Sequence, residues 1–201
     1  TQGVSSAASD VYKRQVDKWG NAFSATPSDP LAGSPIVPGL GIQMSSRGSQ
    51  SWLDPEHPSS LQPWKRPRLT PNPAIAFKDG KLFMPFGTPG GDTQCTSMVQ
   101  LFLNIAEFGM DPQQAIEQPR FAPWNFPNSF WPHQYDPGRL ELEGRIDSEV
   151  IEKLLGLGHH VKTLKDWSPV MGALSAIVVD HEMGTLIGGA DPRRDSYAIG
   201  R

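Results

Sequence analysis

Phe86-Gly87-Thr88-Pro89-Gly90-Gly91-Asp92 joins a strand-like segment, residues 81–84, to a long amphipathic segment that begins near Thr93. The adjacent glycines carry no Cβ, so their backbone N–H groups are unshielded and would lie at the positive end of a helix dipole. Such a corner can hold an anion, which could be a carboxylate, a phosphate or the oxyanion of an acyl-transfer intermediate. A plain strand-to-helix turn explains the same residues. This stretch alone therefore leaves both interpretations open.

The residues before the corner predict two β-hairpins separated by a long loop. Residues 16–26 alternate as strand, turn and strand, with Gly20-Asn21 supplying the positive-φ positions of the turn. Residues 74–77 and 81–86 form a second pair around the turn Lys78-Asp79-Gly80. Residues 30–70 are rich in Pro, Gly and Ser, and ordered loops of this length are usually functional in compact domains.

The residues after the corner predict helices first and a hairpin last. A helix face repeats at spacings of three and four and should end at a Gly109 cap; its residues are Met98, Leu101, Phe102, Ile105 and Phe108. Asp111-Pro112 should open a short helix that stops before Pro119, and Asp147 should cap a helix through Leu157. Residues 140–145 are strand-like, and 175–190 read as a final hairpin. Strands outnumber the centrally grouped helices, which predicts a layered α+β or α/β domain with largely antiparallel sheets.

Composition excludes several classes of function and leaves the compartment open. The net charge of −3 and a pI near 5.9 give no reason to expect nucleic acid or an anionic membrane surface as partner. No apolar run approaches the roughly 18 residues that a membrane helix needs, and the polar start has no secretory h-region.

Two residue types that often carry chemistry have plainer interpretations here. Cys95 is the single cysteine, so no internal disulfide is possible; it is either a low-pKa nucleophile or, as we expect, a small buried residue. His159-His160 at a helix end lacks a third ligand at matching spacing, so no metal site is expected.

Four short blocks in the same order carry a family resemblance. They are Val16-Asp17-Lys18-Trp19-Gly20-Asn21-Ala22, Lys65-Arg66-Pro67, Gly87-Thr88-Pro89-Gly90-Gly91 and Gly189-Ala190-Asp191-Pro192-Arg193. Together they resemble the small, C-terminal subunit of the gamma-glutamyltransferase (gamma-glutamyltranspeptidase) family of N-terminal-nucleophile hydrolases, from about Val16 to Arg201. The resemblance implies an αββα sandwich of largely antiparallel sheets that is incomplete without a large N-terminal subunit from the same autoproteolytic precursor. It implies no metal and no organic cofactor.

The resemblance also implies a mechanism. A Thr exposed by self-cleavage attacks a gamma-glutamyl or related amide, and its own α-amino group, with a pKa of about 8, serves as base. The acyl group then passes to water or to an acceptor. Gly90 and Gly91 are implied at the oxyanion hole. The Asp191-Pro192-Arg193 motif is expected to form an ion pair that anchors the terminus.

The nucleophile is where the chain departs most from the family. The family Thr stands seven residues before the Asp matched by Asp17, and position 10 here is Asp10. Thr1 begins the chain but lies nine residues too far upstream. One hypothesis is that residues 1–15 are not native family sequence, that 16–201 is the family domain and that the true nucleophile is missing. The rival is that Thr1 is a genuine mature N-terminus and the nucleophile.

The predicted substrate contacts depart from the family as well. Ser28 aligns with the family's second Thr, which supports the nucleophile, and keeps a hydroxyl. The family's Asn-Asn-x-Met-Asp-Asp-Phe signature, which holds the glutamyl amino group, is replaced at 45–51 by Ser-Ser-Arg-Gly-Ser-Gln-Ser. Arg47 and Gln50 cannot receive an ammonium, whereas Arg47 offers a fork for a carboxylate. Thr70 keeps half of the paired hydroxyls that grip the substrate carboxylate. Glutathione is therefore doubtful as substrate, and another acidic amide fits better.

Three candidate functions are consistent with the sequence. The first is an amidohydrolase or acyltransferase with an N-terminal Thr. The second is a catalytically silent subunit that only completes a heterodimer. The third is an unrelated α+β binding module, which would require the Gly-Gly corner to lie buried away from any cleft. The acyl donor, the acceptor and the balance of hydrolysis against transfer stay open.

Overall fold

A four-stranded antiparallel sheet forms the centre of the fold. The structure, a computed structural model, describes residues 13–28 and 34–200 of the 201-residue chain. The sheet order is β11–β10–β6–β5, with β5 at Ala74–Lys78, β6 at Lys81–Gly87, β10 at Ser175–Asp180 and β11 at Thr185–Ala190. Both hairpins in it were predicted, and the β5–β6 turn uses positive φ at Asp79 (52°) and Gly80 (75°).

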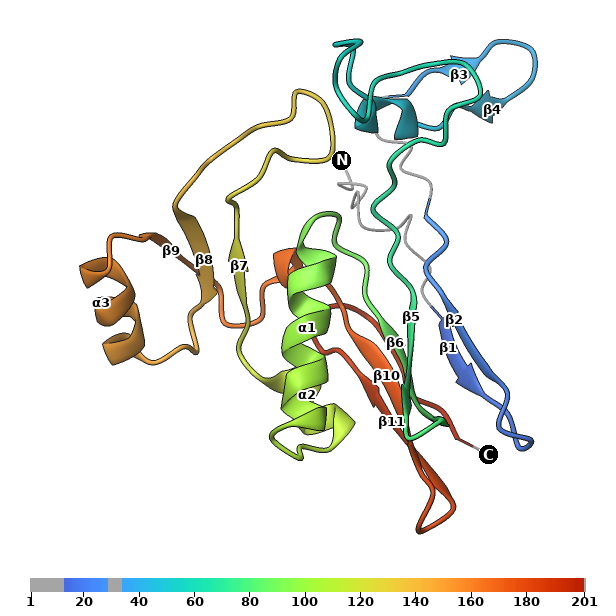
Figure 1. The fold of residues 1–201 in the computed structure, drawn as a ribbon, viewed down its shortest axis with the longest axis vertical. Coiled ribbons are helices and arrows are strands. Elements are labelled where there is room, and N and C mark those ends of the chain that lie inside the picture. The colour runs from blue at the N-terminus through green and yellow to red at the C-terminus, as the bar shows by residue number, and fades with distance from the viewer. Residues whose placement is uncertain (1–12, 29–33, 201) are drawn as a thin grey trace.

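Two helices cover one face of this sheet and enclose the core (Figure 1). They are α1, Thr93–Ala106, and α2, Pro112–Glu117, whose start is capped where the Asp111 carboxylate accepts the Gln114 N–H at 2.9 Å. The buried core joins the two helices to β6 and β10; it includes Met84, Phe86, Met98, Leu101, Ile105, Ile116 and Ala176. The prediction for Phe108 was wrong, because α1 ends at Ala106 and the Phe108 side chain is 71% exposed.

A separate hairpin packs across the central sheet. Strands β1, Lys13–Val16, and β2, Ala22–Ala25, pair antiparallel with Lys13 opposite Ala25 at the open end. The hairpin contacts β5, β6 and β10. The alternation in the sequence predicts a first strand that begins at Val16, but the strand ends at that residue. The chain turns at Asp17 instead, since the Asp17 carboxylate accepts N–H groups of Trp19 and Asn21 at 2.9 Å.

A three-stranded sheet lies on the other side of α1 (Figure 1). Its strands are β7 (Phe121–Pro123), β8 (Arg139–Glu143) and β9 (His160–Leu164), and helix α3 (Ser148–Gly156) connects the parallel pair β8 and β9. Strands β7 and β9 were not predicted, and the exposed His160 begins β9 rather than closing a helix. With this one parallel pair, the predicted α+β class with largely antiparallel sheets is confirmed.

From residue 34 onward, where the structure describes it, the long Pro- and Gly-rich segment forms only short elements. It contains β3 (Ile36–Val37), β4 (Ile42–Gln43) and the 3-10 helix η1 (Arg47–Gln50). In the part of the chain that the structure describes, no helix is long and apolar enough to cross a membrane.

A buried ion cluster ties the C-terminal segment to the centre of the fold. The Asp191 carboxylate contacts the guanidinium of Arg120 at 2.5 Å and that of Arg193 at 3.1 Å, so the predicted ion pair is present. Burial lowers the pKa of Arg120 to about 10, although the Asp191 charge opposes that shift. Asp191 also accepts the Leu174 N–H at 2.7 Å, and Arg120 donates to the Met171 carbonyl at 2.8 Å. The cluster therefore fixes the segment that leads into β10.

Asp191→Asn should lower the free energy of unfolding by about 3–5 kcal/mol, because it leaves the buried Arg120 charge without its partner. Urea denaturation followed by circular dichroism measures the change. The exposed Asp195 provides a matched control, and Asp195→Asn should stay within about 0.5 kcal/mol of the parent. Equal effects of the two substitutions would contradict a stabilising role for the cluster.

Candidate active site

The Gly-Gly corner presents two backbone N–H groups that donate to no acceptor in the described part of the chain. Strand β6 ends at Gly87, so Gly90 and Gly91 lie outside the sheet ladder. Within residues 13–28 and 34–200, neither of their N–H groups has a hydrogen-bond acceptor. Their carbonyls, in contrast, are used by the start of α1: Gly90 accepts from the Thr93 N–H at 3.1 Å and Gly91 from the Gln94 N–H at 3.4 Å. The corner therefore has free donors and occupied acceptors, as an anion site requires.

The backbone of the corner is fixed by a neighbouring loop. Gly90 has φ 131° and Gly91 φ 57°, which side-chain-bearing residues rarely adopt. A Cβ on Gly90 would lie 2.8 Å from Thr93 Oγ1 and 3.3 Å from the Gly172 Cα. The Thr93 hydroxyl also contacts the Val170 carbonyl at 2.9 Å, and Thr88 Oγ1 accepts the Ala173 N–H at 2.8 Å. Glycine at position 90 is thus required by close packing as well as by conformation.

The open end of the β1–β2 hairpin lies beside this corner. The Arg14 guanidinium packs against Gly87 so closely that a Cβ there would lie 1.8 Å from its Nη2. Ser24 Oγ donates to the Phe86 carbonyl at 3.1 Å. The start of β1, at Lys13 and Arg14, therefore lies next to the end of β6. Thr1 and Asp10, the two positions considered for the nucleophile, lie outside the described residues.

The other predicted site residues meet in one hydrogen-bonded cluster. Arg47 Nη1 donates to Gln50 Oε1 at 3.0 Å and to Thr70 Oγ1 at 2.9 Å, and its Nη2 donates to the Ser28 carbonyl at 3.1 Å. Ser28 thus contributes its backbone oxygen to this contact. The four residues come from positions up to 42 apart in the sequence, between 28 and 70, so only the fold brings them together. Their roles with substrate stay predictions.

Asp92 and Ser129 connect the corner to this cluster, and no sequence pattern predicted a site role for either of them. Asp92 is the N-cap of α1, yet its carboxylate accepts the Ser129 N–H at 2.8 Å and the Ser129 hydroxyl. Arg68 contacts the same carboxylate at 3.6 Å. The next residue, Phe130, lies with its ring centre 5.8 Å from the Arg47 guanidinium carbon. An Asp after Gly-Gly indicates a helix N-cap. No local sequence pattern predicts its contact with Ser129, which lies 37 positions away.

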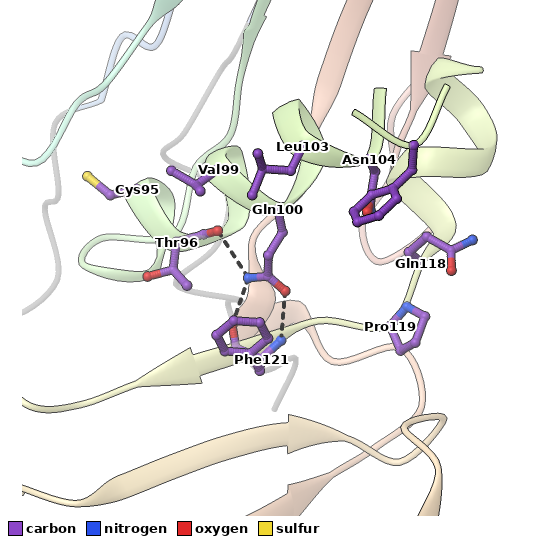
Figure 2. Close-up of a pocket in the computed structure, with 10 residues that line it drawn as sticks. Cys95, Thr96, Val99, Gln100, Leu103, Asn104, Gln118, Pro119 and Phe121 are labelled. Carbon is purple, nitrogen blue, oxygen red and sulfur yellow. Dashed lines mark hydrogen bonds between the residues drawn. The ribbon is translucent and has the colours of Figure 1, made fainter. Parts of the chain in front are cut away.

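A large groove lies elsewhere, on the outer face of α1. It encloses about 590 Å³ and includes Cys95, Val99, Leu103 and Phe121 in its lining (Figure 2). Gln100 joins α1 to β7 within this groove. Its side-chain amide donates to the Phe121 carbonyl at 2.9 Å and accepts the Phe121 N–H at 3.1 Å. The expectation of a buried Cys95 was wrong: the residue is exposed at the edge of this groove.

The described residues contain no group of three or more His, Cys, Asp or Glu side chains that could hold a metal ion. His159 and His160 are both exposed.

Comparison with known proteins places this chain in a family. The family model described as Gamma-glutamyltranspeptidase matches residues 7–201. The glutathione hydrolase-like YwrD proenzyme of Bacillus subtilis (strain 168) is 39% identical over 192 residues, covering 94% of this chain and 35% of that protein. The oxamate amidohydrolase proenzyme of Klebsiella pneumoniae is 39% identical over 166 residues, covering 82% of this chain and 30% of that protein. The chain thus spans about a third of the length of these curated relatives.

The fold agrees with the sequence comparison. The solved gamma-glutamyltranspeptidase from Pseudomonas nitroreducens complexed with L-DON superimposes with a TM-score of 0.77 at 23% identity, covering 94% of this chain and 98% of that one. At this identity the likeness concerns the fold alone. The sequence match over nearly the whole chain and the shared fold together show that this chain belongs to the gamma-glutamyltranspeptidase family.

Proposed function

We propose that this chain is the small-subunit part of an amidohydrolase or acyltransferase that acts through an N-terminal Thr on a gamma-glutamyl or related acidic amide. The observation that carries the proposal is the pair of unused N–H groups at Gly90 and Gly91. When a hydroxyl attacks an amide carbonyl, negative charge develops on the carbonyl oxygen. Two fixed N–H donors at the start of α1 stabilise that charge more in the transition state than in the substrate.

The remaining parts of the mechanism follow from the same chemistry. The α-amine of a chain-initiating Thr takes the proton from its own hydroxyl, the acyl group moves to the Thr oxygen, and the amine product leaves. Water or an amine acceptor then attacks the ester and restores the Thr. The open end of the β1–β2 hairpin beside Gly87 supports a nucleophile that enters from this side. The name of the Klebsiella relative supports an acidic amide, because oxamate carries both an amide and a carboxylate.

A large subunit from the same precursor is the proposed partner. The chain covers only 35% of its Bacillus relative and 30% of its Klebsiella relative. The outer face of α1 exposes apolar side chains, including Val99 at 56% and Leu103 at 42%. An apolar helix face of this kind is suited to burial against a second chain.

A catalytically silent subunit is the second candidate, and Asp10 favours it. The carboxylate of Asp10 stands where the family has its Thr, and a carboxylate provides neither the hydroxyl nor the coupled amine of that mechanism. In this case the oxyanion corner would remain without a nucleophile, and the chain would serve only as a structural partner.

Acyl-adduct mass spectrometry separates the two candidates. The chain is co-produced with its large subunit and incubated with an acidic anilide, in its present form and as a form beginning at residue 10 with Asp10→Thr. We expect an adduct on the new Thr, because the fold already provides the oxyanion donors. The same form with Asp10→Ala is the matched control and should stay unmodified. An adduct on Thr1 of the present form would establish the longer N-terminus as genuine and reject the silent subunit. An unmodified present form beside an acylated Asp10→Thr form would support the silent subunit, and no adduct in any form would contradict the proposed oxyanion donors.

Gly90→Ala tests the oxyanion corner in the form that shows acylation. A Cβ at Gly90 would collide with Thr93 Oγ1, so the corner must shift, and kcat should fall by about 100-fold or more. Gly80→Ala is the control, because Gly80 also has positive φ (75°) but open space around it. It should alter stability and leave kcat unchanged. Equal kcat values for both variants would remove the corner from the reaction.

A further inference from the structure

The hydroxyl of Thr88 makes two hydrogen bonds at the Gly-Gly corner. Thr88 is fully buried, with 0% exposure. Its Oγ1 donates to the Pro89 carbonyl at 2.7 Å and accepts the Ala173 N–H at 2.8 Å. Among the residues that the structure describes, no backbone N–H donates to the Pro89 carbonyl. The direction of this carbonyl is therefore set by one side chain.

The direction of the Pro89 carbonyl in turn sets the direction of the Gly90 N–H. The peptide bond that joins the two residues is trans and planar, so its C=O and its N–H point in opposite directions. A carbonyl that is held toward Thr88 Oγ1 leaves the Gly90 N–H directed away from Thr88. Thr88 thus orients a donor that it does not contact.

The two glycines make this orientation dependent on a specific hydrogen bond. Gly accepts φ values of either sign, so a peptide plane beside Gly reverses at little conformational cost. The plane between Gly90 and Gly91 has its carbonyl fixed by Thr93, whose N–H donates to it at 3.1 Å and whose Oγ1 donates at 2.9 Å. The plane between Pro89 and Gly90, where Gly90 has φ 131°, is fixed at its carbonyl by the Thr88 hydroxyl.

The backbone of Gly172 packs against both partners of this hydrogen bond. A Cβ on Gly172 would lie 2.3 Å from Thr88 Oγ1 and 2.6 Å from the Pro89 carbonyl oxygen. Gly172 therefore shields the hydrogen bond from water on this side, and a shielded hydrogen bond is electrostatically stronger than an exposed one. The Pro89–Gly90 plane is consequently oriented before any substrate binds.

We propose that Thr88 is a positioning residue that directs the Gly90 N–H toward the developing oxyanion through the Pro89–Gly90 peptide plane. Its hydroxyl holds the carbonyl end of the plane, and the opposite end presents the N–H to the substrate. The effect on the reaction rate rests on the proposed function, whereas the effect on the N–H direction does not. Since the contact with the oxyanion forms in the transition state, loss of the orientation should lower kcat and leave KM nearly unchanged.

Three variants separate this role from a general support of the fold. Thr88→Val removes the hydroxyl and keeps the shape of the side chain, whereas Thr88→Ser keeps the hydroxyl. Ser97→Ala is the matched control, because the buried Ser97 hydroxyl donates to the Met171 carbonyl at 3.0 Å, beside Gly172 but outside the corner. Thr88→Ala replaces Thr88→Val if the circular dichroism spectrum of Thr88→Val departs from that of the parent.

Two measurements are made on the parent and on each variant. Residual dipolar couplings of the Gly90 and Gly91 N–H bonds report the directions of these bonds in the full-length protein and require no reaction. The values of kcat and KM are measured with the acidic anilide in the form that shows acylation.

We expect Thr88→Val to change the dipolar coupling of the Gly90 N–H and to leave that of the Gly91 N–H nearly unchanged, because Thr93 still holds the second plane. Its kcat should fall about 10- to 100-fold with KM within about threefold of the parent, as expected for a misdirected oxyanion donor. Thr88→Ser should restore the coupling and kcat. Ser97→Ala should keep both at the values of the parent.

An unchanged Gly90 coupling after removal of the Thr88 hydroxyl would overturn the proposal. An equal change caused by Ser97→Ala, or no recovery with Thr88→Ser, would do the same, because either result would indicate only general support of the loop. If the Gly90 N–H is redirected and no form turns over the anilide, the positioning by Thr88 stands and the proposed reaction fails. A redirected N–H with unchanged kcat would support the reaction and reject a catalytic effect of Thr88.

Discussion

The contact between Gly90 and Gly172 is the constraint on which the proposed chemistry depends. The Gly90 backbone is held at φ 131° with the Gly172 Cα 3.3 Å from the place of a Cβ, and Thr93 fills the remaining space. This packing fixes the backbone that leads into α1. The N–H groups of Gly90 and Gly91 have no acceptor among the described residues, as is general for N–H groups at the start of a helix, while their carbonyls accept from Thr93 and Gln94. Preorganised donors of this kind need no rearrangement when charge develops on a substrate.

The loop that contains Gly172 is fixed in turn by hydrogen bonds from the buried ion cluster of Arg120, Asp191 and Arg193. Arg120 donates to the Met171 carbonyl and Asp191 accepts from Leu174, on either side of Gly172. The cluster thus links the C-terminal Asp191-Pro192-Arg193 segment to the Gly-Gly corner through two short connections. Buried charges are costly unless they are fully paired and hydrogen-bonded. In this cluster some of those hydrogen bonds go to the backbone of Met171 and Leu174, which flank the loop at Gly172. We interpret the cluster as a support of the site as well as of the fold.

Local signals in the sequence predicted much of the fold, and failures occurred where pairing is non-local. The β5–β6 hairpin and α2 have their own turn and cap residues, Asp79-Gly80 and Asp111-Pro112, so they could be read directly. Strand β7 has only three residues, and its partner β8 lies beyond a long aromatic loop. On α1 the sequence reading recognised the stripe of Met98, Leu101 and Ile105. It missed the second stripe of Cys95, Val99 and Leu103 at spacings of four, which faces outward and lines the groove.

The residues of the Arg47 cluster were named from the sequence one by one, whereas their arrangement could not be predicted; their roles with substrate stay predictions. The family resemblance pointed to Ser28, Arg47, Gln50 and Thr70 separately, and only the fold shows that Arg47 contacts the other three. The roles of Asp92 and Ser129 could not be read from sequence, because their contact spans 37 positions.

The most direct test of the central claim is a crystal structure of the trapped acyl form that carries a Thr at position 10. The acyl carbonyl oxygen should lie about 2.7–3.1 Å from the backbone nitrogens of both Gly90 and Gly91. A carbonyl oxygen directed away from these nitrogens, toward solvent or other donors, would contradict the account.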